Sequence, residues 1–287
     1  MNSNPLRSPR STALSNNYRA ALNSSALALA MGFSASGAFA AGTAFDTAAN
    51  YVGTWGTSAA NLGSGFGAWN FTLNNANNPP YVGTYLDQTS YGNPDGALSA
   101  GYAWGTYANG GSGNGSFVMT RPFTSGGGST SLVNQGFSFL MGSGGVGGTG
   151  SSISASIGTA FTLSYVGGGA DNLMLSVDGA ANVPLTVTFA NINSGILVGL
   201  TVTGPANNES APYSLVISPA AGGAALATMS GTFDSSAFNT ANFSFTDFNT
   251  AHDAFVNNLT IVPEPSSLML LAAGAGAAQF FRLRRKS

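Results

Sequence analysis

Apolar residues recur at every second position in a series of short runs between residues 51 and 262. Leu185 and Val187, for example, alternate with Thr186 and Thr188. Successive side chains of a strand point to opposite faces, so such a run presents an apolar row to a core and a polar row outward. No long stretch of helical periodicity occurs among these runs, and the pattern predicts an all-β fold.

The runs recur about every ten residues, which favours a two-sheet sandwich of jelly-roll type over a propeller or a solenoid. Hairpin turns are expected at Asp178 and Gly179 and at the glycines 167–169, because glycine adopts the positive φ that tight turns need. The strands are expected at 68–73, 102–107, 116–120, 136–141, 161–166, 173–177, 185–189, 196–202, 213–218, 227–233, 242–248 and 254–262.

Charge is almost confined to the two ends of the chain. Charged residues make up 6% of the sequence, against about a quarter in ordinary soluble domains. Residues 41–262 contain nine acids and one cation, Arg121, so their net charge is 1 − 9 = −8. Binding to nucleic acid requires clustered Lys and Arg, which this region lacks, and nucleic acid is excluded as a partner.

Residues 1–40 follow the pattern of a secretory signal. Basic residues at Arg7, Arg10 and Arg19 precede an apolar run at 26–33, and small residues at Ala38 and Ala40 form a cleavage site. We therefore expect an N-terminal signal helix, removed by cleavage after Ala40 to leave a mature chain that begins at Ala41.

The C-terminal end predicts a transmembrane helix with a basic membrane stop. The apolar stretch 268–281 spans ~21 Å as a helix, somewhat short of the ~30 Å hydrocarbon core. Arg282, Arg284, Arg285 and Lys286 follow at once, and such cations stay on the cytoplasmic side. The segments before the helix are therefore expected outside the cytoplasm. A buried core helix is the alternative interpretation.

The junction before this helix contains Pro263, Glu264 and Pro265. This triplet, the apolar helix and the basic cluster together resemble the PEP-CTERM sorting signal of Gram-negative bacteria, over some 25 residues. The resemblance implies that an exosortase, a membrane cysteine transpeptidase-like enzyme, recognises the triplet and cuts near it. It assigns no catalysis to the chain itself. Prolines hold the segment extended, as the cleft of a processing enzyme requires.

Three regions are thus expected: a signal peptide at 1–40, a β-sandwich body at 41–262, and the sorting signal with its helix and basic tail at 263–287. The hairpin pattern over 161–179 resembles concanavalin A-like jelly rolls, a likeness that transfers no binding residue. The glycine-rich stretches 109–116 and 141–151 lack aromatic and charged residues, so we interpret them as spacers in preference to ligand-binding loops.

Few residues of the body could perform catalysis. The chain has no Cys, and His252 is its one histidine, so paired-histidine and thiolate metal sites are excluded. The acids are scattered singly, and no pair suited to glycoside hydrolysis is identifiable. We expect no enzymatic activity and assign no cofactor. Calcium stays open: Asp171 lies in a stretch that resembles one RTX repeat, although such repeats act in stacks and a turn is the preferred interpretation.

Aromatic residues are concentrated early in the body, and two interpretations follow. They fill one end of the core, which we prefer, or they line an exposed sugar-binding groove. The residues concerned are Trp55, Trp69, Tyr81, Tyr85, Tyr91, Tyr102, Trp104 and Tyr107.

The sequence predicts an exported, non-enzymatic protein of the cell surface or extracellular matrix, associated with biofilm or exopolysaccharide. Its expected partners are the export machinery, an exosortase and, before processing, the inner membrane, with the body in the periplasm. The alternative is a carbohydrate-binding, lectin-like module.

Overall fold

The structure is a computed structural model. It describes residues 44–55, 61–75, 82–87, 101–108, 115–125, 128–129, 135–146, 149–168, 172–203, 210–235, 242–249 and 253–263. The chain divides into two compact units, 1–39 and 40–287, and all described residues belong to the second unit.

The first sheet, sheet I, has eight strands in the order β15-β14-β13-β8-β17-β4-β3, with β1 also paired to β17. All its pairs are antiparallel. Its strands are β1 (Ala44–Asp46), β3 (Val82–Asp87), β4 (Ala103–Ala108), β8 (Gln135–Ser143), β13 (Ile196–Val202), β14 (Ala211–Pro219), β15 (Ala227–Phe233) and β17 (Ala254–Pro263).

The second sheet, sheet II, has seven antiparallel strands in the order β12-β11-β10-β9-β16-β5-β2. Its strands are β2 (Asn70–Asn75), β5 (Gly115–Pro122), β9 (Ser152–Ile157), β10 (Phe161–Val166), β11 (Asn172–Val177), β12 (Val183–Thr188) and β16 (Asn242–Phe248). The remaining elements are the hairpin of β6 (Thr124–Ser125) and β7 (Gly128–Ser129), the 3-10 helix η1 (Ala48–Tyr51) and the helix α2 (Phe189–Asn193).

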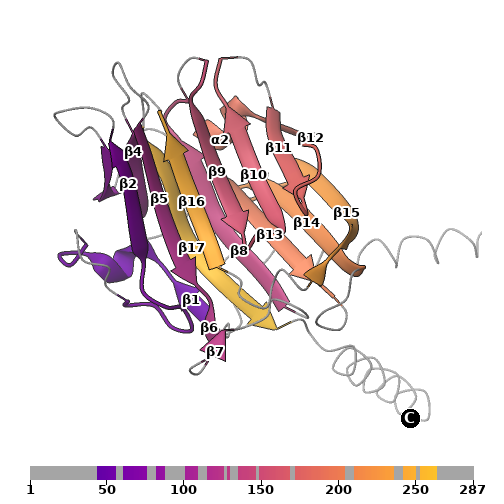
Figure 1. The fold of residues 1–287 in the computed structure, drawn as a ribbon, viewed down its shortest axis with the longest axis horizontal. Coiled ribbons are helices and arrows are strands. Elements are labelled where there is room, and N and C mark those ends of the chain that lie inside the picture. The colour runs from indigo at the N-terminus through magenta and orange to yellow at the C-terminus, as the bar shows by residue number, and fades with distance from the viewer. Residues whose placement is uncertain are drawn as a thin grey trace, which may run out of the picture. The chain divides into compact units, whose positions relative to one another are not determined.

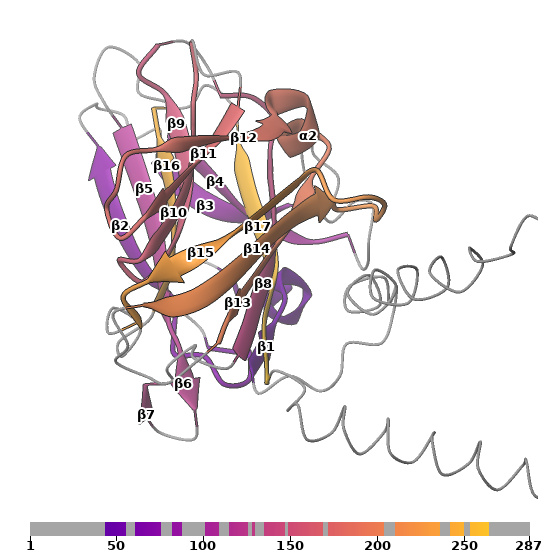
Figure 2. The ribbon, with the colours of Figure 1, turned by 90° about the vertical axis from the view of Figure 1, so that its right-hand side faces the viewer.

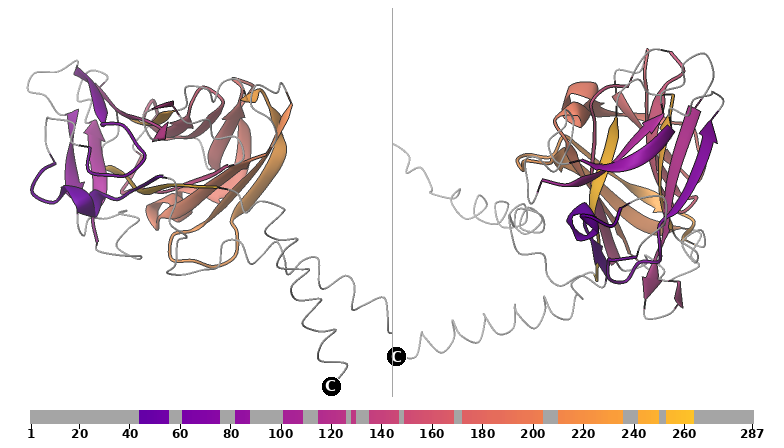
Figure 3. Two further views of the ribbon diagram at one scale, coloured as in Figure 1. Left: turned by 90° about the horizontal axis from the view of Figure 1, so that it is seen from below. Right: turned by 90° about the vertical axis from the view of Figure 1, so that its left-hand side faces the viewer.

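The two sheets form the layers of a sandwich, as Figures 1 and 2 show. The core lies between them, because the alternate residues predicted to face inward are the buried ones. Phe243 and Phe245 of β16, for example, are 0% exposed, and the ring of Phe243 packs against those of Phe137 and Phe139 of β8 across the core. The prediction of an all-β two-sheet sandwich is confirmed, and Figure 3 shows the same two layers from two further sides.

The predicted hairpin turn at Asp178 and Gly179 is present, and the one at 167–169 is described as far as Gly168. Asp178 and Gly179 have φ values of 52° and 70°, and the N–H of Ala180 donates to the carbonyl of Val177 at 2.9 Å. Positive φ at both central residues is the geometry of a type I′ turn, which matches the twist of the flanking strands. Gly168, between β10 and β11, has a φ of +75°, and a Cβ there would lie 2.3 Å from the backbone nitrogen of Thr149. Only glycine fits that position.

The structure corrects several local predictions, among them the lack of an expected strand at β3. The strand expected at 185–189 ends at Thr188, because Phe189 begins α2. Asn191 Oδ1 accepts from the Thr188 backbone N–H at 2.9 Å and thereby favours the helical start. In addition, β9 was not predicted, although its residues Ile153, Ala155 and Ile157 alternate inward and are buried.

The predicted terminal helices lie outside the described residues. Within the described part of the chain, no helix has the length and apolar character to cross a membrane.

Candidate functional site

The folded body extends to the first residue of the predicted sorting triplet. Pro263 is the last residue of β17 and pairs with Gln135 of β8, after Val262, which pairs with Gly136. The other residues of the predicted signal, Glu264, Pro265, Arg282, Arg284, Arg285 and Lys286, lie outside the described residues. No linker therefore separates the last strand from the triplet.

Different strands flank the two ends of β17. Ala254–Val256 pair with β4, whereas 259–261 pair with the short strand β1, and β8 lies along the other side of both. The partner changes at a register shift between Asn257 and Thr260, where Asn258 has a φ of 52°. Figure 1 shows β17, in yellow, reaching the end of the body where β1 lies. The segment that leads into Pro263 is thus enclosed by β1 and β8.

Asn257, at this shift, fixes the turn that follows β1. Its Oδ1 accepts from the backbone N–H of Ala48 at 2.8 Å and from the Thr47 hydroxyl at 3.2 Å, and its Nδ2 donates to the Tyr102 carbonyl at 2.5 Å. Asn257 is fully buried. A buried amide with these bonds aligns β1 with β17, because its loss would leave buried backbone groups unpaired.

A buried ion pair joins β1 to the opposite sheet. Asp46 of β1 and Arg121 of β5 are both 0% exposed, and Arg121 Nη1 donates to Asp46 Oδ2. The Tyr51 hydroxyl donates to Asp46 Oδ2 at 2.7 Å and accepts from Arg121 Nη1 at 3.0 Å. Arg121 Nη2 also donates to Asn61 Oδ1 at 2.8 Å. We call Asp46, Tyr51, Asn61 and Arg121 the Asp46 cluster.

Aromatic rings surround this cluster. Arg121 Cζ lies 5.0 Å from the ring centre of Phe66 and 5.1 Å from that of Trp69, in the range of cation–π contacts. Burial raises the pKa of Tyr51 above its usual value, and the Asp46 carboxylate adds to this, against the lowering effect of the Leu62 N–H and Arg121. The Tyr51 hydroxyl therefore keeps its proton and remains a donor to Asp46.

The tryptophans belong to the core, as preferred from the sequence. Trp69 and Trp104 are 0% exposed and pack edge to face with ring centres 5.0 Å apart, while the partly buried Trp55 packs against both. A sugar-binding groove lined by these three rings, the observation that would have favoured a lectin, is absent from this part of the described structure. Tyr102 also packs on the core, and Tyr81 and Tyr91 lie outside the described residues.

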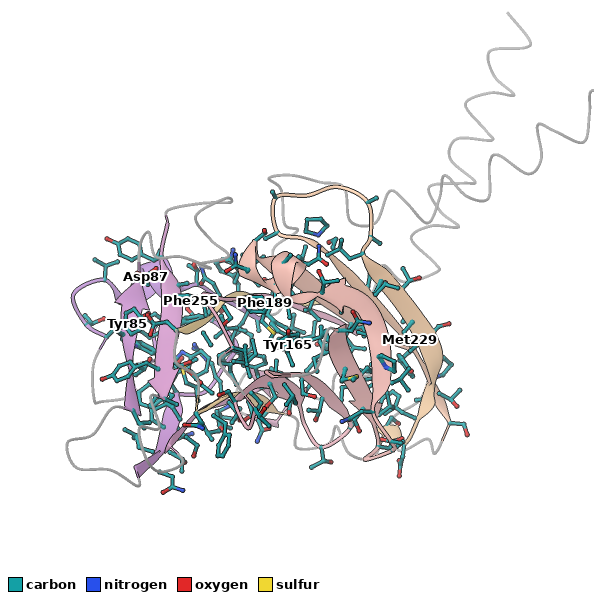
Figure 4. All side chains as sticks on the ribbon, turned by 90° about the horizontal axis from the view of Figure 1, so that it is seen from above. Tyr85, Asp87, Tyr165, Phe189, Met229 and Phe255 are labelled. Carbon is teal, nitrogen blue, oxygen red and sulfur yellow. The ribbon has the colours of Figure 1, made fainter. Side chains whose placement is uncertain are left out.

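Tyr85 and Tyr107 differ from the tryptophans, because they share the outer face of sheet I. Tyr85 is paired with Gly105, directly opposite on β4, and Phe255 is paired with the same glycine from β17. Figure 4 shows Tyr85, Asp87 and Phe255 close together, far from Met229 of β15. Burial raises the pKa of Tyr85 strongly, and the carboxylates of Asp253, Asp87 and Asp247 raise it further. The rings of Tyr85 and Tyr107 are half-buried on this face, whereas the Tyr85 hydroxyl, Asp87 and Phe255 are buried.

Four residues considered above as cleavage, calcium or catalytic candidates lie outside the described residues: Ala38, Ala40, Asp171 and His252. The described residues contain no group of three or more His, Cys, Asp or Glu arranged to hold a metal. The prediction that the acids are scattered singly concerned pairs of carboxylates, whereas Asp46 is paired with a cation, Arg121, and this ion pair was not predicted. The sequence indicates that Arg121 is buried, because it follows Phe117 and Met119 and precedes Phe123 at every second position, on the inward side of the strand.

Comparison with known families matches residues 262–286 to the PEP-CTERM protein-sorting motif. The chain carries a PEP-CTERM sorting motif. This motif implies export, processing by an exosortase and a location at the cell surface. Its first residues, Val262 and Pro263, are the last two residues of β17, so the motif overlaps the folded body by two residues.

No curated protein matches the sequence significantly. The body is similar to several solved structures, at low identity. The globular domain of T. cruzi calreticulin matches at 7% identity and a TM-score of 0.41, over 76% of this chain and 95% of that one. The lectin from Bauhinia forficata in complex with GalNAc matches at 7% identity and a TM-score of 0.37, over 68% and 99%.

The binding domain of botulinum neurotoxin DC, solved in complex with rat synaptotagmin II, matches at 8% identity and a TM-score of 0.40, over 69% of this chain. The present chain spans only 44% of that neurotoxin chain. Likenesses of this strength carry no argument about ligands, and the fold rests on the strand order described above.

Proposed function

We propose that the chain is a non-enzymatic structural or interaction protein, whose sandwich is delivered through its sorting motif to the cell surface or extracellular matrix. The observation that carries the proposal is the overlap of the motif with β17. Because no linker separates β17 from the motif, processing at the motif takes place directly beside the folded body. The predicted signal peptide, transmembrane helix and exosortase cut supply its route across the inner membrane.

The charge of the body supports a role in an uncharged polymer matrix, such as exopolysaccharide in a biofilm. Arg121 is the one Lys or Arg within 41–262, and it is fully buried. The surface of this region therefore offers no Lys or Arg to an anionic partner. The outer faces of the strands carry Ser and Thr, such as Ser154, Ser156 and Ser214, whose hydroxyls suit hydrogen bonding to polysaccharide.

Mass spectrometry of the mature termini tests this function, in cells with and without the processing enzyme. We expect an N-terminus at Ala41 and loss of 268–281 from protein recovered at the surface. The variant Glu264→Ala/Pro265→Ala changes the triplet without altering β17, and it should leave full-length protein in the inner membrane. The matched control Ser266→Ala/Ser267→Ala should be processed normally. Surface protein that retains an intact tail would contradict the proposal.

Carbohydrate binding by a concanavalin A-like jelly roll is the second candidate. It is favoured by the outer face of sheet I, where the half-buried rings of Tyr85 and Tyr107 lie 6.1 Å apart, and not by the tryptophans. Aromatic rings beside polar groups are typical of sugar-binding surfaces. Sedimentation of the protein with purified exopolysaccharide tests it. Tyr107→Ala should abolish co-sedimentation, whereas Thr228→Ala, on the distant exposed strand β15, should not. Equal co-sedimentation of both variants would exclude this face as the binding surface.

A further inference from the structure

The residues just before the sorting triplet have little free backbone. At 259–261, β17 is paired with β1 on one side, and at 260–263 it is paired with β8 on the other. Processing enzymes bind a peptide substrate as an extended strand, through main-chain hydrogen bonds. Main-chain groups already used within a sheet are not available for that contact. The part of the chain that an enzyme can hold therefore begins at the end of β17.

Withdrawal of this segment from the sheet would disturb more than two strand pairings. Leu259 and Ile261 are 0% and 1% exposed, so withdrawal brings apolar side chains into water. Displacement of β1 would also separate Asp46 from Arg121, whose ion pair spans the two sheets. Leaving a buried charge unpaired is strongly unfavourable. Figure 2 shows β1 beside β17 at this end of the body.

We propose that β1, anchored by the Asp46 cluster, clamps the end of β17 and sets the N-terminal limit of exosortase processing. The cut falls on the C-terminal side of Pro263, in a body whose β17 stays whole and paired. This inference rests on the proposed sorting function. It adds that the fold of the body, as well as the sequence of the motif, determines which peptide bonds the enzyme can reach.

A disulfide across the clamp provides the test. Phe45 and Thr260 are directly opposite, and both backbone groups of Phe45 bond Ser64 at 2.9 Å, on the side away from β17. They therefore form a non-hydrogen-bonded pair, with Cα atoms ~4.5 Å apart, which a disulfide can bridge. The chain has no native Cys, so Phe45→Cys/Thr260→Cys can form only this intramolecular bond.

We expect the full-length locked protein to be processed in the oxidising periplasm at the same bond and to the same extent as the wild type. The matched control Phe45→Ser/Thr260→Ser lacks the cross-link and should behave identically. Accumulation of unprocessed locked protein, relieved by reduction, would show that the clamp must open during cleavage and would overturn the proposal.

Weakening the clamp should allow the enzyme to cut peptide bonds on the N-terminal side of the wild-type site. Asp46→Asn removes the charge that holds Arg121, and we expect shorter products whose C-termini lie within 257–262. Adding the Phe45–Thr260 cross-link to Asp46→Asn should restore the single wild-type terminus, which separates clamp opening from failure to fold. A single wild-type terminus from Asp46→Asn alone would overturn the proposal.

The C-terminus of the mature wild-type protein distinguishes failure of the clamp proposal from failure of the proposed function. A mature C-terminus before Pro263 would overturn the clamp while leaving exosortase sorting intact. Absence of any cut would overturn both.

Discussion

The core of the sandwich differs between its two halves. Strands β9 to β15 contribute no fully buried polar side chain among the described residues, and leucine, isoleucine and valine dominate their inward positions. The other half, which contains β1, β4, β5, β16 and β17, buries an ion pair and several polar side chains beside the tryptophans. The buried polar residues there include Asp46, Thr106, Arg121, Asp247 and Asn257.

This difference indicates two ways of holding two sheets together. Apolar packing is non-directional and tolerates small shifts between neighbours. A buried ion pair with its hydrogen bonds is satisfied in one arrangement only, and we interpret the Asp46 cluster as a device for specificity more than for stability. The polar half is also the half that contains the end of β17. The more directional core thus lies where the chain enters its sorting motif.

The largest effect is expected for Arg121→Ala, which leaves Asp46 buried without its partner. We expect a loss of about 3–5 kcal/mol in the free energy of unfolding, measured by urea denaturation. The double variant Asp46→Leu/Arg121→Met replaces the pair with apolar side chains and should lose far less. If the double variant is as unstable as Arg121→Ala, an unpaired charge is not the cause.

In the apolar half, Leu175→Ala should cost about 2–4 kcal/mol, since it deletes a fully buried side chain and leaves a cavity. The control Met174→Ala, on the half-buried outer face of β11, should cost under about 1 kcal/mol. The same denaturation experiment measures both. A larger loss for Leu175→Ala than for Arg121→Ala would reverse the proposed contrast between the halves.

Gly63→Ala tests how rigidly Asp46 is held. A Cβ at residue 63 would lie 2.4 Å from Asp46 Cγ, so either the carboxylate or the loop must move. We expect a cost of about 1–3 kcal/mol, by the mechanism of overpacking. In an Asp46→Ala background the same substitution should cost much less, and a double-mutant cycle measures that coupling. Additive losses would indicate that the two residues do not compete for space.

The smallest effect is expected for Tyr51→Phe, which removes one hydroxyl from the Asp46 cluster, at about 1 kcal/mol near neutral pH. Because the pKa of Tyr51 is raised in the folded protein, its protonated form favours folding. That contribution is complete below the unfolded pKa of about 10 and is lost as the pH rises above it. Unfolding measured between pH 8 and 11.5 should therefore give a shallower alkaline decline for Tyr51→Phe, by up to about 1.4 kcal/mol per pH unit. Equal slopes would contradict this.

Strands with regular alternation were predictable from the sequence, and others were not. β10, β13, β15 and β16 have the predicted bounds, because an apolar residue recurs at nearly every second position in them. β9 was missed since Ser and Ala give a weak apolar signal, even though its inward residues are buried.

The Asp46 cluster was not predictable as a whole. The inward phase of Arg121 is visible in the sequence, but its partner lies 75 residues earlier, on a three-residue strand too short to show a pattern. Pairing across two sheets depends on the register of both, which local alternation does not fix. The sorting motif, by contrast, is a continuous segment, and its residues could be identified without the fold.

The place of β17 has a consequence for the order of assembly. It is the last strand among the described residues, yet it lies between β8 and β4 in the interior of sheet I. In a chain exported from its amino end, β4 and β8 cannot be joined until the final residues before the motif have crossed the membrane. Until then both strands keep open edges, which favour association with other chains. Completion of sheet I and arrival of the motif at the membrane surface are therefore nearly simultaneous, so a chain halted earlier would remain an open, aggregation-prone intermediate.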